Sequence, residues 1–245
     1  MSTATSRMIF LSCAIFIQLF ALTTTAQPNF QYCADTGNFT DNRVYESNLN
    51  QVLSSIAADT KITYGFYNFS LGDHPDEVHA IGLCRGDLKP EICRTCLRNS
   101  IQEIRNLCPT QKEAIVWYDN CMFRYSDRHI FGSLETGPYF WMYSMNNVSN
   151  PSEFNQAVIS ILDKLTSRAA SGDSRLKFAT DSTTTASSQT IFALVQCTPD
   201  LSMEACRECL TNTTGLFPQC CDGRQGGRVM APSCNFWYEK DKFYN

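Results

Sequence analysis

Apolar residues recur with the period of a helix in two stretches of the chain. Leu49, Val52, Leu53 and Ile56 fall at positions i, i+3, i+4 and i+7, a spacing that places them on one face of an amphipathic helix. The same one-sided stripe runs through residues 154–165. We expect each stripe to be the face that its helix packs onto a core.

Each predicted helix is followed by the same kinds of element. Val78–Cys84 and Ile191–Cys197 are short apolar runs typical of strands. A second helix is expected to begin near Pro90 in one half and near Ser202 in the other, because proline suits the first helical turn and serine caps a helix. The final strands are predicted where β-branched and aromatic residues gather, in residues 115–125 and 228–238.

The stretch between these two halves is too apolar for a flexible linker. Its large apolar residues are Phe131, Tyr139, Phe140, Trp141 and Tyr143. Such side chains are rarely left in water, so we expect the two halves to pack rigidly. Gly137-Pro138 predicts a turn at the boundary. A first strand of the second half is then expected to start near Tyr139.

Five cysteines recur in one register, with the spacing C-x8-C-x2-C-x11-C-x12-C in both halves. They are Cys84, Cys93, Cys96, Cys108 and Cys121 in the first copy and Cys197, Cys206, Cys209, Cys221 and Cys234 in the second. Leu97 and Tyr125 recur in the same register as Leu210 and Tyr238. The pattern predicts two homologous domains held by disulfides. The second copy has about eight extra residues between its first helix and its first cysteine, and we expect a loop to hold them.

The N-terminus favours an oxidising compartment. Arg7 precedes the apolar stretch Met8–Leu22, and small residues lead up to Ala26, which is typical of a secretory signal peptide. Removal of residues 1–26 takes Cys13 with it and leaves an even number of cysteines. We predict a signal peptide over 1–26, a first domain over 27–136 and a second over 137–245.

Composition narrows the classes of function. The net charge of -4 does not fit the basic surface of a protein that binds nucleic acid or anionic membrane. With 43% hydrophobic residues the chain is expected to be globular. No stretch after the leader approaches the roughly 20 apolar residues of a membrane span, so a secreted, soluble protein is expected. Four sequons predict N-glycosylation at Asn38, Asn68, Asn147 and Asn212.

The motifs resemble those of a known plant family. They are Cys84-x8-Cys93-x2-Cys96, Cys197-x8-Cys206-x2-Cys209, Cys-Arg-Gly-Asp at Cys84, and Gly227-Arg228-Val229 before Ser233-Cys234-Asn235. Together they resemble the tandem domains of plant cysteine-rich repeat secretory proteins. Those domains are similar to ginkbilobin, a seed antifungal protein, and to the ectodomains of cysteine-rich receptor-like kinases. The resemblance implies an α+β fold in which each domain is an antiparallel sheet packed against two helices.

The resemblance also implies a disulfide pairing, which the sequence by itself does not choose among the possible ones. The implied pairs are Cys33 with Cys108, Cys84 with Cys93, Cys96 with Cys121, Cys197 with Cys206, and Cys209 with Cys234. The second domain departs from this pattern, because nothing near Tyr143 replaces Cys33 and an extra Cys220 stands beside Cys221. Either these two form a strained vicinal disulfide, or one thiol is free for an intermolecular bond. A link from Cys33 to either one would exclude both alternatives.

Catalysis has little support in the sequence. The C-x2-C units suggest zinc or thiol redox chemistry, but a secreted chain would oxidise these cysteines, and no thioredoxin-like pattern surrounds them. His74, His79 and His129 belong to no catalytic motif, and we expect all three at the surface or in loops. Arg85-Gly86-Asp87 is interpreted as a turn. We expect no enzyme activity, metal or cofactor.

A carbohydrate site is the remaining candidate. In the ginkbilobin-like family an asparagine, an arginine and a glutamate hold mannose, and counting from the last cysteine places Arg228 and Glu239 in two of those positions. The third position aligns loosely with Asn146 or Asn147, and a glycan on Asn147 would block the site. A guanidinium and a carboxylate suit sugar hydroxyls, and Trp237 and Tyr238 offer rings for stacking. The alternative interpretation is a cross-strand ion pair on a solvated sheet.

Two functions therefore compete. The first is a secreted, non-enzymatic binding protein of the apoplast that takes mannose-containing glycans or cell-wall polysaccharide, with an antifungal or stress-defence role. The second is an interaction module that binds receptor-like kinase ectodomains, or itself, without sugar. A large aromatic surface without affinity for glycans would favour the second.

Overall fold

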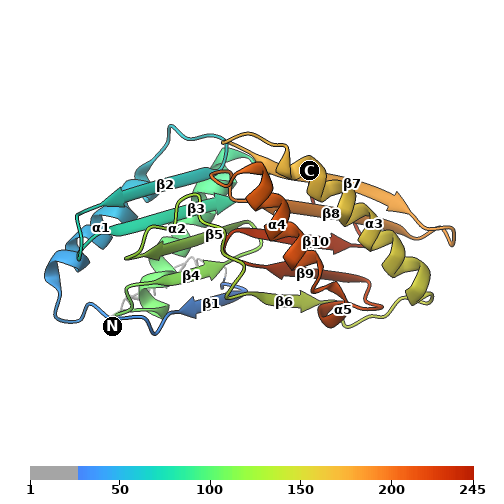
Figure 1. Cartoon of the computed structure of the whole chain (residues 1–245), viewed down its shortest axis with the longest axis horizontal. Coiled ribbons are helices and arrows are strands. Elements are labelled where there is room, and N and C mark those ends of the chain that lie inside the picture. Colours follow the sequence, from blue (N-terminus) through green and yellow to red (C-terminus); the bar gives the residue numbers. More distant parts are fainter. Residues whose placement is uncertain (1–26) are drawn as a thin grey trace, which may run out of the picture.

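The computed structural model describes residues 27–245, so the predicted signal peptide lies outside the described part of the chain. These residues form two antiparallel five-stranded sheets, each with helices on one face (Figure 1). The predicted α+β class with two helix-covered sheets is confirmed.

The two sheets have the same strand order. In the first it is β1-β4-β5-β3-β2, and in the second β6-β9-β10-β8-β7. The elements of the first are β1 Phe30–Cys33, α1 Arg43–Ala58, β2 Phe66–Leu71, β3 Val78–Cys84, α2 Pro90–Leu107, β4 Ala114–Trp117 and β5 Cys121–Ser126. Those of the second are β6 Phe140–Tyr143, α3 Pro151–Ala170, β7 Lys177–Thr184, β8 Thr190–Cys197, α4 Met203–Thr214, α5 Phe217–Cys220, β9 Gly226–Met230 and β10 Cys234–Glu239.

The strand register repeats as well. In the first sheet β3 and β5 place Cys84 opposite Cys121, and in the second β8 and β10 place Cys197 opposite Cys234. The last cysteine of each copy therefore starts a strand beside the first cysteine of that copy. A sheet register is strongly specified where one face is buried, so the repeated spacing corresponds to a repeated sheet.

The helices form where the apolar stripes predicted them. All four members of the first stripe are buried in α1, and the second stripe is buried in α3. Pro90 is the first residue of α2, and the Ser202 side chain caps α4 by accepting a hydrogen bond from the backbone N–H of Ala205. The helices of each domain cover one face of its sheet. Each domain has its own apolar core between these helices and the sheet.

Three strands were not predicted. They are β1, β2 and β7, all at the edges of the sheets. The sequence of β7 is KFATDSTT, and much of β2 is exposed. Edge strands face water on more sides than central ones and so carry a weaker apolar signal.

The extra residues of the second copy do not lie in a loop. Helix α3 has 20 residues where α1 has 16, and β7 has 8 where β2 has 6. The expectation of a longer loop was wrong. The added residues lengthen the helix by about one turn and extend the hairpin, which buries Thr166, Ala169 and Ala170 near the C-terminal end of α3.

Disulfides fasten the helices to the sheets. Helix α2 is bonded to β3 through Cys84 and Cys93 and to β5 through Cys96 and Cys121. The second domain has the two corresponding bonds, Cys197 with Cys206 and Cys209 with Cys234. Only the first domain has a bond that closes its edge strand, Cys33 with Cys108. In the second domain Cys220 is bonded to Cys221, and both are buried.

A buried tyrosine occupies the equivalent position in each domain. Tyr125 and Tyr238 are fully buried, and each hydroxyl donates to carbonyls of the loop that follows the second helix. The acceptors include the carbonyls of the paired positions Cys108 and Cys221. Burial raises the pKa of the Tyr125 phenol to about 12 and that of Tyr238 further still. These hydrogen bonds hold the loop in both domains, and in the second domain no bond corresponding to Cys33–Cys108 helps to hold it.

The domains meet through the faces of the sheets that carry no helices. A third apolar cluster joins Trp117 and Met122 of the first sheet to Met230 of the second. The ring of Phe140 stacks on Phe30 at 4.7 Å and meets Trp117 edge-on at 5.5 Å. The apolar stretch between the domains is therefore packed into their junction.

Polar contacts close the same junction. The linker residue Glu135 accepts from Arg124 at 2.6 Å, and its backbone exchanges hydrogen bonds with Ser233 of the second domain. The Gln196 amide of β8 donates to the buried carbonyl of Cys84 at 2.8 Å. The domains thus share both an apolar cluster and buried hydrogen bonds.

The asymmetric disulfide leads to a stability prediction. The double variant Cys33→Ala, Cys108→Ala should lower the free energy of unfolding by about 3 to 5 kcal/mol, because this bond closes the longest loop of the chain. Urea unfolding of purified, non-reduced protein measures the change. A loss under about 1 kcal/mol would show that the edge strand is held without the bond.

Candidate ligand-binding site at the domain junction

The predicted sugar residues Arg228 and Glu239 lie on one face of the second sheet. Arg228 of β9 stands opposite Trp237 of β10, and Glu239 stands opposite Gly226. Alternate residues of a strand share a face, so Arg228, Trp237 and Glu239 form one row. This is the face that meets the first domain.

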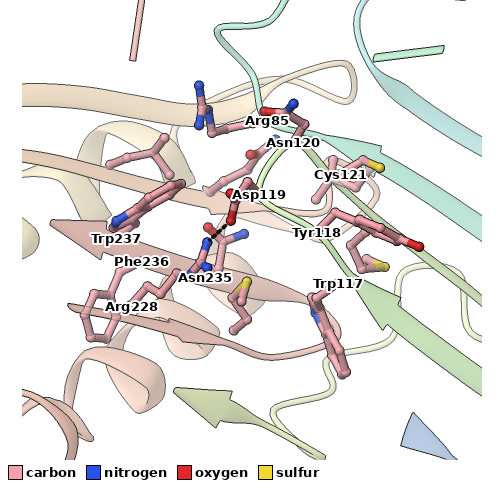
Figure 2. A pocket seen from close by; sticks show the side chains of 15 residues that line it. Arg85, Trp117, Tyr118, Asp119, Asn120, Cys121, Arg228, Asn235, Phe236 and Trp237 are labelled. Carbon is pink, nitrogen blue, oxygen red and sulfur yellow. Dashed lines mark hydrogen bonds and ion pairs between the residues drawn. The ribbon is translucent and has the colours of Figure 1, made fainter. Parts of the chain in front are cut away.

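The Arg228 guanidinium is already engaged there. It is 8% exposed, and its Nη1 donates to Oδ1 of Asp119 in the first domain at 2.6 Å (Figure 2). Its planar group lies over the Trp237 ring at 4.7 Å, and its other terminal nitrogen approaches the Met142 sulfur. An arginine held this way joins the domains and has little surface left for a ligand.

The expected stacking rings are covered as well. Phe243 from the C-terminal segment stacks on Trp237 with centroids 4.3 Å apart, and Arg228 packs on the same ring system. Tyr238 points to the opposite face of the sheet and is fully buried among Phe154 and Phe217. Neither ring offers an open face to a sugar.

Glu239 and Asn147 do not complete the predicted trio. Glu239 accepts a hydrogen bond from the Trp237 indole at 2.9 Å, and burial raises the pKa of this carboxyl. Asn147 lies in the loop after β6, where its side-chain oxygen accepts from Arg224 at 2.9 Å. The structure therefore brings Arg228 and Glu239 to one face and places Asn147 against a different arginine.

The four sequon asparagines, Asn38, Asn68, Asn147 and Asn212, are all exposed. Their exposure leaves each side chain accessible to the glycosylation machinery. N-glycosylation at these positions stays a prediction.

Asp119 is the residue that organises the accessible side of the junction. It lies in the turn between β4 and β5 and accepts from the Asn29 side chain at 2.9 Å as well as from Arg228. Partial burial raises the pKa of this carboxyl, but the hydrogen bond and charge of Arg228 outweigh burial and hold the pKa below its usual value. Asp119 is thus an anion at neutral pH, and its side chain is 60% exposed.

A polar cleft opens beside Asp119. Its volume is about 450 Å³, within the range of small-molecule sites. The N-terminal segment, the first half of α2 and the β4–β5 turn line it, with Gln27, Asn29, Glu91, Ile92, Thr95, Cys96, Asn99, Tyr118, Asp119 and Asn120. Most of these residues carry amides, hydroxyls or carboxylates, and none is a lysine or arginine.

Tyr118 gives the cleft its one deeply buried polar atom. The residue is 7% exposed, and its hydroxyl has no hydrogen-bond partner in the described part of the chain. Burial raises the pKa of this phenol to about 12, so the hydroxyl keeps its proton and is a donor. The hydroxyl oxygen is almost fully inaccessible, so it lies beneath the surface of the cleft and does not contact what the cleft holds.

The lining indicates which ligands suit the cleft. Amides and carboxylates together donate to and accept from neutral hydroxyls, whereas an anion would meet two carboxylates and no cation. No motif in the sequence indicates this site, because its residues come from three separate segments. The one weak signal is the pair Asp119-Asn120 directly before Cys121.

The cysteines and histidines considered for catalysis or metal binding have structural surroundings. The cysteines of both C-x2-C units are in disulfides, and residues 27–245 contain no cluster of potential metal ligands. The expectation that all histidines are superficial was wrong for His79, which is 7% exposed and packs against His129 and Phe131. It lies in β3, on the face that the linker covers.

The Arg85-Gly86-Asp87 turn belongs to the junction. Arg85 binds both oxygens of Asp87 and also donates to the Phe243 carbonyl. Asn245 donates to Asp87 from the other side. The tripeptide is therefore a turn held by the C-terminal segment, as the sequence predicted.

Sequence comparison identifies relatives along the whole described chain. A family model described as salt stress response/antifungal matches residues 32–128 and 142–241. Cysteine-rich repeat secretory protein 38 of Arabidopsis thaliana is 41% identical, with 92% of each chain covered. Antimicrobial ginkbilobin-2-like protein of Castanea crenata is 36% identical, with 87% of this chain and 88% of the relative covered. Cysteine-rich receptor-like protein kinase 26 of Arabidopsis thaliana is 40% identical over 94% of this chain, which spans 35% of the kinase.

Solved structures share the fold. The tandem DUF26 ectodomain of the Arabidopsis thaliana receptor-like protein PDLP8 superposes with a TM-score of 0.74 at 23% identity, covering 87% of this chain and 98% of that one. The ectodomain of PDLP5 gives 0.70 at 24% identity, covering 86% and 98%. Among residues 27–245 no helix is long and apolar enough to cross a membrane.

The Arg228–Asp119 pair predicts a pH-dependent cost of mutation. Because the folded pKa of Asp119 is below the unfolded one, the pair stabilises the protein above about pH 4 and loses that effect as the pH falls through the folded pKa. Arg228→Ala should cost about 1 to 2 kcal/mol at pH 7, from the pair and from packing on Trp237, and less at pH 2.5. Urea unfolding at both values measures this, and an equal cost at both would contradict the charge contribution.

Proposed function

This chain belongs to the salt stress response/antifungal family, and we propose that it is a secreted, non-enzymatic protein that binds a mannose-type saccharide in the cleft beside Asp119. Its place of action is the apoplast, and its role is antifungal or stress defence. The family description and the names of the secretory and antimicrobial relatives support this role.

The observation that carries the proposal is the lining of the cleft. Asn99 and Asn120 supply amide donors and acceptors, and Asp119 supplies a carboxylate that accepts from two adjacent hydroxyls. The Tyr118 ring belongs to the same lining, with its hydroxyl buried beneath it. Neutral vicinal hydroxyls satisfy all of these groups at once, and cell-wall polysaccharides present them.

Arg228 does not line the cleft but acts on it through Asp119. It holds Asp119 as an oriented anion, 2.6 Å from its own guanidinium, and does not touch the sugar. Glu239 and Asn147 lie outside the cleft lining. The proposed site therefore differs from the trio implied by the family resemblance, and all of its lining residues belong to the first domain.

A binding role without catalysis is consistent with the chemistry of the cleft. Glu91 is exposed and lies 3.6 Å from Arg94, and Asp119 is held as an anion by Arg228. The Asp119 carboxyl is therefore not kept protonated, as a general acid for glycoside cleavage would be. The cleft is therefore suited to holding a saccharide and not to cleaving it.

Calorimetric titration with mannose and mannohexaose tests the proposal. The wild type should bind, and Asn99→Ala or Asn120→Ala should weaken binding about tenfold, because each removes a hydrogen bond to the ligand.

Asn106→Ala is the matched control for this experiment. Asn106 lies two helical turns after Asn99 on the same helix and outside the cleft. This variant should bind like the wild type. Absence of binding by the wild type, or equal losses in all three variants, would refute the saccharide site.

A second candidate function rests on the exposed sheet edge. Among residues 27–245 no strand pairs with the outer side of β1 or β6, and the two lie along the same side of the molecule (Figure 1). Their segments carry an aromatic edge of large exposed apolar residues, namely Phe30, Tyr32, Tyr139, Met142, Tyr143 and Met145. Such an edge suits a partner that adds a strand, either a receptor-like ectodomain or a second copy.

Sedimentation velocity across a concentration series tests the aromatic edge. If the edge self-associates, the wild type should show dimers at tens of micromolar, and the double variant Tyr139→Ser, Met145→Ser should not, because it removes two of the most exposed side chains. A wild type that stays monomeric and does not bind a tandem ectodomain in solution would exclude this function. Loss of sugar binding by the double variant would show instead that the edge belongs to the saccharide site.

A further inference from the structure

A narrow pocket lies at the domain junction, next to the cleft beside Asp119 (Figure 2). The volume of this junction pocket is about 40 Å³, which is room for about three water molecules. Tyr118, Asp119 and Asn120 line both the junction pocket and the cleft, so the two adjoin along the β4–β5 turn. The junction pocket differs from the cleft in that β8, β9 and β10 of the second domain also line it.

Two asparagines, one from each domain, present free amides to the junction pocket. Asn120 lies in the β4–β5 turn and Asn235 in β10, and both are half-buried. The hydrogen bonds at this place are those of Gln196 and Arg228, and among residues 27–245 none engages either asparagine side chain. Unlike the Tyr118 hydroxyl, their amide atoms are not enclosed by the protein. A small polar group that enters the pocket can therefore reach them.

Gln196 gives the junction pocket a fixed acceptor. It stands opposite Asn235 in the sheet register and is 2% exposed. Its Nε2 donates to the Cys84 carbonyl of the first domain at 2.8 Å, which sets the orientation of the amide. No residue from 27 to 245 donates to its Oε1, and this atom is not enclosed. Amides that both donate and accept suit a hydroxyl group, which does the same.

The charges of the junction pocket favour a neutral group. Its two guanidinium groups are already paired. Arg85 donates to both oxygens of Asp87, at 2.6 and 3.0 Å, and Arg228 donates to Asp119 at 2.6 Å. A carboxylate or phosphate would find no unpaired cation in this lining, whereas a hydroxyl needs none.

The size of the junction pocket restricts the group further. A space for about three waters is too small for a pyranose ring, but it admits one carbon and one oxygen. The apolar part of the lining, which includes Met122, Leu194 and Met230, suits the carbon. The hydroxymethyl group of a hexose has this size and this division into an apolar and a polar part.

We propose that the junction pocket is a subsite for the hydroxymethyl group of a hexose unit whose neighbouring unit lies in the cleft beside Asp119. This inference rests on the proposed function and extends it from one sugar unit to two. Asn120, Asn235 and the Oε1 of Gln196 hydrogen-bond the hydroxyl. The second domain therefore takes part in recognition, although it contributes nothing to the lining of the cleft.

Calorimetric titration of the full mature chain tests the subsite. The probes are mannose, mannobiose and a deoxy analogue of mannobiose that lacks the hydroxyl of each hydroxymethyl group. The wild type should bind mannobiose about tenfold more tightly than the analogue, because the analogue leaves the pocket amides unpaired. Asn235→Ala and Gln196→Ala should abolish this preference and leave the affinity for mannose unchanged, since neither residue lines the cleft.

The two variants differ in their expected effect on folding. Gln196→Ala also removes the donor to the Cys84 carbonyl, so its melting temperature should fall. Asn235→Ala breaks no hydrogen bond within residues 27–245 and should melt like the wild type, so its sugar preference can be measured on intact protein. Gln156→Ala is the matched control, because this glutamine of α3 is exposed and lines neither the pocket nor the cleft. It should keep the full preference for mannobiose.

The failure of the subsite and that of the cleft give different results. If the wild type binds mannose but does not distinguish mannobiose from its analogue, or if Asn235→Ala keeps the preference, the subsite is overturned and the cleft stands. If the wild type binds neither mannose nor mannobiose, the proposed function fails and the subsite fails with it.

Discussion

The packing of the two helix-free sheet faces against each other is the constraint on which the rest of the structure depends. Each domain has a core of its own under its helices, and the junction adds a third cluster built around Trp117 and Met230. Buried hydrogen bonds from Gln196 and Glu135 accompany this cluster. Because linker residues pack inside the junction, the two domains behave as one body whose surfaces are fixed relative to each other.

This packing determines which polar residues of the two domains are accessible to a ligand. The second domain keeps the arginine and glutamate that the family resemblance associates with sugar, but the junction covers them. Arg228 donates a hydrogen bond to Asp119, and the Trp237 ring packs against Phe243 and Arg228. The polar surface that stays accessible is on the first domain, beside the same aspartate. A site inferred for an isolated domain therefore need not survive when the domain is one of a pair.

Much of the fold could be predicted from the sequence, because periodicity and cysteine spacing are local signals. The apolar stripe of α1 and the serine cap of α4 are examples in which one segment decides its own structure. Edge strands such as β7 could not be predicted, because their sequence is mostly polar. The roughly eight extra residues of the second copy were expected in a loop, but length alone does not distinguish a longer loop from a longer helix. The candidate sites could not be predicted. Asn29, Asn99 and Asn120 come together only in the folded domain, and Arg228 changes its role through a residue 109 positions away.

The most direct test of this account is a map of backbone amide chemical shifts during a mannose titration of the isotope-labelled mature chain. The central claim is that the junction moves the accessible saccharide site to the first domain. The account predicts that the amides of Asn29, Asn99 and Asn120 shift with increasing sugar, while those of Glu239 and Asn147 stay in place. Shifts confined to Glu239, Asn147 and their neighbours, or no shifts at all, would contradict it.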